Sequence, residues 1–134
     1  MERRSRCCFL FRLPTGRIAG RVRPALTRVI RSIPDSARSS LTWDQGKEMA
    51  EHVGVTNDTG LPVCFCDPRS RWQRPTIENL NGLLRQNFPR SADLTAFSDQ
   101  EIRSGALELN RRPRCTLAWR TPEEVIKEGV ESIA

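Results

Sequence analysis

Short apolar runs alternate along the chain with segments of helical periodicity, and this alternation constrains the fold more than any other feature. Residues 6–13, 41–43 and 61–66 are apolar and bounded by turn-forming residues, so each is predicted to be a strand. Residues 24–33 carry an apolar stripe at helical spacing, and Pro34 ends it. Strands that are separated by helices tend to pair in parallel. The sequence therefore predicts an α/β domain with a partly parallel sheet.

Four more helices are predicted after the second strand. The first covers 45–52, with Gly54 past its end. The second covers 75–88 and has a proline in its first turn, where a missing N–H costs nothing. Two capping boxes, in which a Ser or Thr is followed three residues later by Glu, predict helices over 98–109 and 121–130.

The chain of 134 residues is basic, with a net charge of +6. Its first 40 residues hold ten Arg and only two acids. This balance is typical of proteins that bind nucleic acid, but a solvated basic face gives the same count, and charge alone leaves both interpretations open.

Five cysteines without framework spacing argue against a secreted disulfide scaffold. Because no apolar run is long enough to span a bilayer, we expect no membrane partner and a cytoplasmic, nucleoid-associated location.

Two carboxylates occupy positions that suit phosphoryl-transfer chemistry. Asp44 directly follows a short apolar strand, and active sites of α/β proteins lie at the carboxyl ends of strands. Glu78 lies in the first turn of the helix over 75–88, on a face shared with Gly82 and Arg85. The other face is apolar and is expected to pack on the sheet. Taken singly, each acid is better explained by a structural role: Asp44 as a loop or N-cap residue, and Glu78 as a partner of the helix dipole.

Three runs of residues resemble motifs of insertion-sequence transposases with a retroviral-integrase-like core, in particular of the insertion sequence thirty family. Residues 41–49, Leu-Thr-Trp-Asp-Gln-Gly-Lys-Glu-Met, resemble the motif of the second catalytic acid. Residues 63–86, with Cys-Asp-Pro, Trp-Gln-Arg and Glu-Asn, resemble the motif of the third. Residues 110–125, with Asn-Arg-Arg-Pro-Arg and Thr-Pro-Glu-Glu, resemble the C-terminal signature. Thirty-three residues separate Asp44 from Glu78, which is similar to the family's spacing.

The resemblance implies a ribonuclease-H-like fold, the integrase catalytic core, with a mixed sheet flanked by helices. It implies that Asp44 and Glu78 are two of three metal-binding, catalytic carboxylates of a DDE transposase. The implied cofactor is Mg²⁺ or Mn²⁺, at a two-metal site that cleaves DNA and transfers strands. The implied partners are DNA, both terminal repeats and target, and a second copy or a full-length transposase.

Basic and aromatic residues near Glu78 and after the fourth helix are predicted to bind DNA, because arginines contact phosphates and aromatic rings stack on bases. The predicted DNA-binding residues are Arg71, Trp72, Gln73, Arg74, Arg85, Arg111, Arg112 and Arg114. For the last three, a solvated face explains the sequence equally well. Trp43 and Trp119 are instead predicted to be core residues, and Asp67 is predicted to cap the turn at Pro68.

The resemblance also predicts that the catalytic site is incomplete. In that family the first acid lies on a strand upstream of a Glu-Arg-x-Ser-Arg segment, which here occupies positions 2–6. We therefore expect the first acid and its strand to be missing, with 1–113 a partial catalytic core and 114–134 a C-terminal helical extension. The chain alone is expected to be inactive. The alternative function is a non-catalytic remnant or regulator that binds DNA or a full-length transposase.

Three positions near Glu78 depart from the family pattern. Arg71 stands where the family has Pro, Pro75 where it has Gly, and Ile77 where it has Asn. Pro75 removes a backbone N–H and stiffens the entry to the helix. These departures argue against full activity even with the first acid supplied.

Overall fold

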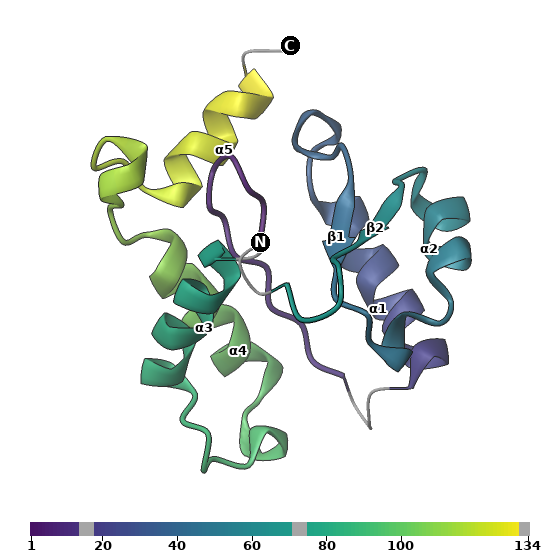
Figure 1. Ribbon diagram of the computed structural model, residues 1–134. Coiled ribbons are helices and arrows are strands. Elements are labelled where there is room, and N and C mark those ends of the chain that lie inside the picture. The colour runs from purple at the N-terminus through teal and green to yellow at the C-terminus, as the bar shows by residue number, and fades with distance from the viewer. Residues whose placement is uncertain (14–17, 71–74, 132–134) are drawn as a thin grey trace. The chain divides into compact units, whose positions relative to one another are not determined.

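The computed structural model describes residues 1–13, 18–70 and 75–131 (Figure 1). The chain divides into two compact units, which we call the central unit, Leu13–Gln73, and the terminal unit, Met1–Arg12 with Arg74–Ala134. Helices and strands alternate in the central unit, in the order α1 (Ala19–Ser32), β1 (Leu41–Trp43), α2 (His52–Thr59) and β2 (Val63–Phe65). The helices of the terminal unit are α3 (Pro75–Asn87), α4 (Asp99–Asn110) and α5 (Pro122–Glu131).

The strands of the central unit confirm the prediction of a parallel pairing. β1 pairs with β2 in parallel, and Thr42 lies opposite Cys64. The pairing continues past the strand end, where the Cys66 N–H donates to the Trp43 carbonyl at 2.9 Å. β2 is shorter than the predicted run of 61–66. Within the described residues these are the only two strands, so the observed fold is a mixed α/β arrangement with a two-stranded parallel sheet.

Helix α1 begins five residues before the predicted start at Pro24. Its apolar stripe extends back to Val22, which is buried together with Leu26 and Ile30. The Ile18 carbonyl accepts hydrogen bonds from the N–H groups of both Arg21 and Val22, which closes the first turn ahead of the proline. A helix can therefore form on either side of Pro24 because burial of the stripe outweighs the lost hydrogen bond.

The prediction of a helix over 45–52 that ends before Gly54 was wrong. Only Lys47–Met49 form a short 3-10 turn there, and Gly54 lies inside α2. The missing side chain explains its place, because a Cβ on Gly54 would lie 2.5 Å from Cζ of Arg23 on α1. The glycine that ends the helix is Gly60, whose φ of 73° is left-handed. Gly54 thus permits a close approach between two helices, which a sequence cannot distinguish from a helix end.

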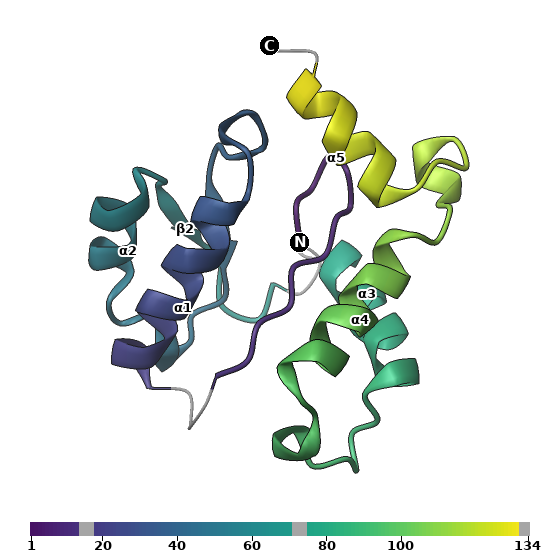
Figure 2. The same ribbon diagram turned by 180° about the vertical axis from the view of Figure 1, so that it is seen from behind.

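The N-terminal segment does not form the predicted strand over 6–13. Its backbone pairs instead with a side chain of α4, because the Cys8 N–H donates to Asn110 Oδ1 at 2.7 Å and Asn110 Nδ2 donates to the Cys8 carbonyl at 2.9 Å. Figures 1 and 2 show this segment running alongside α4 from both sides. An amide side chain satisfies both backbone groups of Cys8, so the segment is extended without a partner strand.

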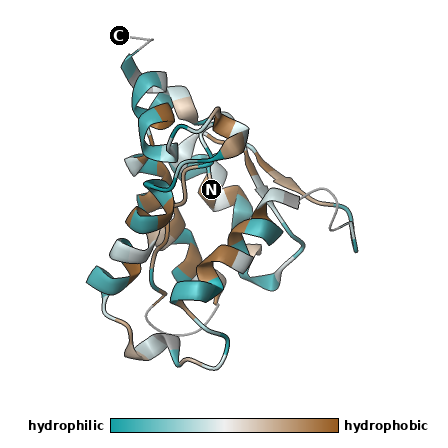
Figure 3. Cartoon of the chain, turned by 90° about the vertical axis from the view of Figure 1, so that its left-hand side faces the viewer, coloured by the Kyte–Doolittle hydropathy of each residue, from teal (hydrophilic) through white to brown (hydrophobic). Residues whose placement is uncertain are grey.

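The three helices of the terminal unit match their predictions closely. The capping box at Ser98 is complete, since the Ser98 hydroxyl accepts from the Glu101 N–H and the Glu101 carboxylate accepts from the Ser98 N–H. Thr121 and Glu124 make the same reciprocal pair before α5. Hydrophobic and hydrophilic residues alternate along these helices (Figure 3), as expected for amphipathic helices that each bury one face.

The core of the terminal unit lies between α3, α4 and the N-terminal segment. Leu80 and Leu109 are buried there together with Cys8, and Leu84 packs against them. The predicted apolar face of α3 is therefore buried, against α4 and the N-terminal segment. Its expected packing on the sheet stays a prediction. None of the helices within the described residues has the length and apolar character that crossing a bilayer requires.

Candidate active site and basic surfaces

Asp44 lies at the carboxyl end of β1, as predicted. It is exposed, and its backbone carbonyl accepts a hydrogen bond from the Gly46 N–H at 2.8 Å. The Gln45 side chain donates to the Cys66 carbonyl at 3.4 Å, which ties the end of β1 to the end of β2. The chain thus turns sharply at Asp44, and the turn leaves its carboxylate at the sheet edge where α/β proteins place reactive groups.

Asp67 lies at the same edge of the sheet, one residue beyond the end of the β1–β2 pairing. Its backbone carbonyl accepts from the Ser70 N–H at 3.1 Å, so Asp67 opens a turn at Pro68. The position of the turn agrees with the prediction, and capping by the Asp67 side chain remains a prediction.

Glu78 lies in the first turn of α3 on the face opposite the core. Its side chain is exposed, as are Gly82 and Arg85 on the same face. Apart from the backbone of α3 itself and the two chain neighbours, no atom of the described residues lies within 4 Å of the position that a Cβ on Gly82 would take, so this face is open beside the acid. A carboxylate, an arginine and a gap in side-chain cover are what a bulky anionic ligand needs in order to approach the helix.

Asp44 belongs to the central unit and Glu78 to the terminal unit, so each carboxylate is described within its own unit. Within the described residues, no group of three His, Cys, Asp or Glu side chains lies close enough to hold a metal ion. The side chains of Asp44 and Glu78 offer carboxylate oxygens, which are the hard ligands that Mg²⁺ and Mn²⁺ prefer. Their chemistry therefore fits part of a divalent metal site.

The predicted DNA-binding arginines occupy different environments. Arg71, Trp72, Gln73 and Arg74 lie outside the described residues. Arg85 is exposed in the last turn of α3. Its position on the face of Glu78 agrees with the spacing argument, while its contact with DNA remains a prediction.

Arg111 and Arg112 are exposed or half-exposed and form ion pairs. Arg111 Nε lies 3.2 Å from a carboxylate oxygen of Glu123, whose other oxygen contacts Lys127. Hydrogen bonds from Lys127 and then Arg111 hold the pKa of the Glu123 carboxyl below its usual range. Arg112 pairs with Glu108 on α4. The charge of this basic cluster is thus largely balanced by acids, which favours the interpretation as a solvated face for these two residues.

Arg114 differs from its neighbours because it has no ion pair within the described residues. It is half-buried, its Nη2 donates to the Leu109 carbonyl at 3.4 Å, and its buried Nε has no hydrogen-bond partner in the part of the chain that the structure covers. Unmet guanidinium donors are costly unless a ligand or solvent satisfies them. Of the three arginines in this cluster, Arg114 is therefore the one whose charge no described acid balances.

The prediction that Trp119 is a core residue was wrong. Its side chain is 72% exposed, and it sits at the tip of a tight turn in which Ala118 and Trp119 both have positive φ, 53° and 64°. The turn is closed by Arg114 and Arg120, whose backbones form an isolated antiparallel bridge. The sequence did not indicate this turn, because neither of its two left-handed residues is Gly or Asn.

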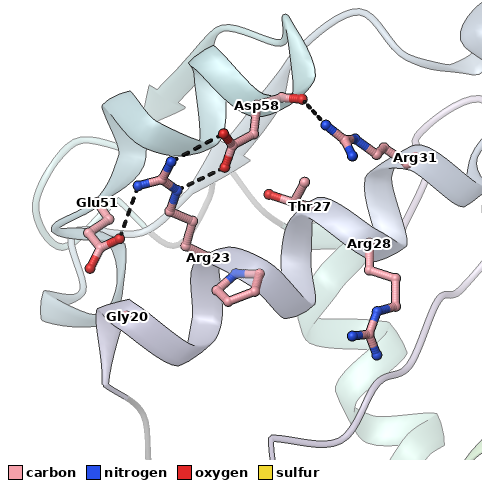
Figure 4. Close-up of a pocket in the computed structure, with 8 residues that line it drawn as sticks. Gly20, Arg23, Thr27, Arg28, Arg31, Glu51 and Asp58 are labelled. Carbon is pink, nitrogen blue, oxygen red and sulfur yellow. Dashed lines mark hydrogen bonds and ion pairs between the residues drawn. The ribbon is translucent and has the colours of Figure 1, made fainter.

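Sequence reasoning missed an arginine cluster on α1. Arg23 donates two hydrogen bonds to the Asp58 carboxylate of α2, from Nε at 2.8 Å and from Nη2 at 3.1 Å (Figure 4). Its Nη1 lies 3.4 Å from a carboxylate oxygen of Glu51. Arg31 donates to the Asp58 carbonyl at 3.0 Å. The bond from Arg23 keeps the pKa of the Asp58 carboxyl below its usual range. Since Arg23 and Asp58 lie 35 positions apart, no local pattern indicates their pairing, which joins α1 to α2 beside a cavity of about 650 Å³.

Comparisons with known proteins point to one class of relatives. No protein-family model matches the chain. A transposase of insertion sequence element IS30C from Escherichia coli (strain K12) is 46% identical over 130 residues, which cover 97% of this chain and 34% of that protein. The transposase of insertion sequence element IS1086 from Cupriavidus metallidurans is 43% identical over 128 residues, covering 96% and 38%. The transposase of IS4351 from Bacteroides fragilis is 36% identical over 89 residues, covering 66% and 27%.

The matches extend over almost all of this chain but only part of each relative. The chain spans about a third of the length of the curated relatives that it matches. The identity includes both units and therefore the segments that carry Asp44 and Glu78, since the matches with IS30C and IS1086 leave out only a few residues of the chain. The chain is thus homologous, over nearly its whole length, to transposases of the IS30 type.

Proposed function

We propose that the chain is a part of the catalytic core of a DDE transposase, with a ribonuclease-H-like fold, and that Asp44 and Glu78 are two of its metal-binding carboxylates. The observation that carries the proposal is the placement of both acids in a chain homologous to insertion-sequence transposases. Asp44 follows a parallel strand and Glu78 opens a helix on its exposed face. The parallel β1–β2 pair, with a helix before and after β1, is compatible with part of such a fold.

The proposed cofactor is Mg²⁺ or Mn²⁺, held by the carboxylate oxygens of Asp44 and Glu78. When bound, such a pair of ions activates the attacking hydroxyl and stabilises the leaving oxygen of a phosphodiester. The protein groups would then have separate tasks. Asp44 and Glu78 would supply the carboxylate oxygens that bind the metal ions, and Arg85 would hold a DNA phosphate along the open face of α3. Gly82 leaves room for the sugar-phosphate backbone beside Glu78.

We further propose that the chain on its own does not cleave DNA. Two carboxylates hold a two-metal pair poorly, and a third is normally required.

The partner in this proposal is DNA, bound through arginines in a salt-sensitive manner, with association to a second copy or to a full-length transposase. The second candidate, a non-catalytic DNA-binding remnant or regulator, is favoured by the net charge of +6.

Paramagnetic Mn²⁺ tests the two metal ligands directly. In nuclear magnetic resonance spectra of the 134-residue chain, the amide signals of Asp44 and Glu78 should broaden at the same Mn²⁺ concentration. Glu78→Gln should weaken broadening at Asp44 as well, because a shared ion has lost one of its ligands. Broadening at neither acid, or broadening at Asp44 that is indifferent to Glu78→Gln, would contradict the assignment. Asp93→Asn, an exposed acid distant in sequence from both, is the matched control.

A nicking assay separates the enzyme from the binding remnant. The chain is incubated with duplex DNA carrying terminal repeats in Mg²⁺ or Mn²⁺, and cleavage and retention on DNA are measured in parallel. We expect retention that falls with salt and no cleavage. Robust cleavage that Glu78→Gln abolishes would overturn the proposed inactivity and establish the enzyme. Absence of any salt-sensitive retention would overturn DNA as the partner.

A further inference from the structure

The Glu-Arg-Arg-Ser-Arg segment at positions 2–6 forms a compact turn rather than a strand. The Glu2 carboxylate accepts hydrogen bonds from the N–H groups of Arg4 and Ser5, at 2.7 and 2.6 Å, and from the Ser5 hydroxyl. Burial raises the pKa of the Glu2 carboxyl, but the hydrogen bonds from Ser5 and Arg4 outweigh it, and the pKa is lowered. Ser5 is itself buried. The turn is thus built around an ionised carboxylate, and it fixes the direction in which Arg6 leaves the backbone.

Arg6 has a positive φ of 61°, a left-handed conformation that is unfavourable for a residue with a side chain. Its guanidinium is held in place, since Nη1 donates to the Thr76 hydroxyl of α3 at 2.6 Å. A strained backbone that directs an arginine onto another element is a feature found at ligand sites, where the surrounding structure imposes the strain.

A cavity of about 430 Å³ lies beside Arg6, within the terminal unit. Arg6 and Arg114 line it from two segments far apart in sequence, together with the polar side chains of Thr76, Asn79 and Thr116. Leu80 closes part of the wall. No carboxylate is among the residues that line this cavity in the described part of the chain, whereas the cavity beside α1 contains both Glu51 and Asp58.

Neither arginine that lines this cavity is paired with an acid in the described part of the chain. Arg114 has no acidic partner within the described residues, and its Nε has no hydrogen-bond partner there. Arg6 donates to a neutral hydroxyl, and no acid within the described residues balances its charge. Two guanidinium groups, two hydroxyls and an amide around one space match the oxygens of a phosphate, which accepts several charge-assisted hydrogen bonds at once.

We infer that this cavity, which we call the Arg6–Arg114 pocket, binds a backbone phosphate of DNA. The inference rests on the proposed function for the source of the phosphate, and it joins Arg114, already predicted to bind DNA, to Arg6 and Thr76 in one pocket. Thr76 and Asn79 come from the same first turns of α3 as Glu78 but from another face of the helix. A phosphate held there sets the register of the DNA strand relative to Glu78 without taking part in the chemistry.

Charge insertion tests the Arg6–Arg114 pocket. Thr116→Glu places a carboxylate at the exposed rim of the pocket, and Ser104→Glu adds the same charge at an exposed position of α4 outside it. Binding of a fluorescent DNA duplex is measured by anisotropy from 50 to 300 mM salt. We expect Thr116→Glu to weaken binding about tenfold more than Ser104→Glu and to lower the salt slope by about one further phosphate contact. Equal effects of the two variants would overturn the inference.

A second measurement identifies the source of the phosphate and does not depend on catalysis. The Nε–H signals of Arg6 and Arg114 are followed by nuclear magnetic resonance during titration with the same duplex and, separately, with inorganic phosphate. We expect both signals to shift with the duplex at concentrations where Arg103, an exposed arginine of α4, does not. Shifts with inorganic phosphate but none with the duplex would overturn DNA as the ligand and leave an anion pocket. No shift with either probe would overturn the pocket itself.

Discussion

Replacing Gly82 and Gly105 with alanine, one at a time, should change the stability of the terminal unit in opposite directions. Both glycines lie in helix interiors, where alanine is favoured over glycine by about 0.5–1 kcal/mol. At Gly82 nothing lies within 4 Å of the added Cβ, so the whole gain is kept. For a unit of this length, each kcal/mol of added stability raises the melting temperature by roughly 4–8 °C.

At Gly105 the same gain meets a steric cost. The added Cβ would lie 2.7 Å from two ring carbons of Phe88, and that ring is already in edge contact with Phe97, their centroids 5.1 Å apart. Overpacking of this kind costs about 1–3 kcal/mol, so Gly105→Ala should lose up to about 2 kcal/mol after the helix gain is subtracted.

Thermal unfolding of both variants and of the unaltered chain, followed by circular dichroism, measures the two effects. A melting temperature that rises for Gly105→Ala, or falls for Gly82→Ala, would refute the reasoning from open and filled space. If Gly82→Ala is stabilised as expected but is retained less well on DNA, the gap beside Glu78 is used by a ligand. Unchanged retention would count against the proposed role of Gly82.

Three further outcomes follow from contacts in the two units. Ser98→Ala removes the complete capping box of α4 and should destabilise the terminal unit by about 1 kcal/mol, measured by urea denaturation; no change in midpoint would contradict this. Asp58→Asn should lower stability at pH 7, and because the pKa of Asp58 is depressed in the fold, the difference from the unaltered chain should begin to shrink as the pH falls below about 4, the unfolded value, and be lost below the folded pKa. A difference that stays constant through the acid range would show that charge is not its cause. In thiol titration at pH 8, the exposed Cys64 and Cys115 should react first, while the buried Cys7, whose pKa is raised to about 11 chiefly by burial, should react only on unfolding.

The elements predicted best are those whose signals are local. The capping boxes at Ser98 and Thr121 specify helix starts by reciprocal hydrogen bonds between residues three apart, and both are present. The periodicity of α3 and the apolar run of β1 also depend on neighbours only. Each of these elements is formed by interactions that lie within one window of the sequence.

Where the sequence misled, the deciding contact came from a distant residue. Gly54 lies within α2, where an added Cβ would meet the Arg23 guanidinium of α1. In the segment at 6–13, the Cys8 backbone pairs with the Asn110 side chain rather than with a strand. Trp119 is exposed in a turn in which it and Ala118 both have positive φ.

The candidate site follows the same division between local and distant signals. The strand end at Asp44 and the exposed helix face of Glu78 follow from local patterns, while the balanced charges of Arg111 and Arg112 depend on acids that only the fold brings near.

The bond between Cys8 and Asn110 also orders events during synthesis. It joins residues 102 positions apart, and the central unit lies entirely between them. The central unit is continuous in sequence, so it can collapse while the ribosome is still adding residues, whereas the terminal unit must wait for α4. Closing so long a loop is slow compared with forming local helices. Until that happens, the apolar N-terminal segment is available to chaperones. In a protein made without its first twelve residues, the core between α3 and α4 should lose the side chains that this segment contributes.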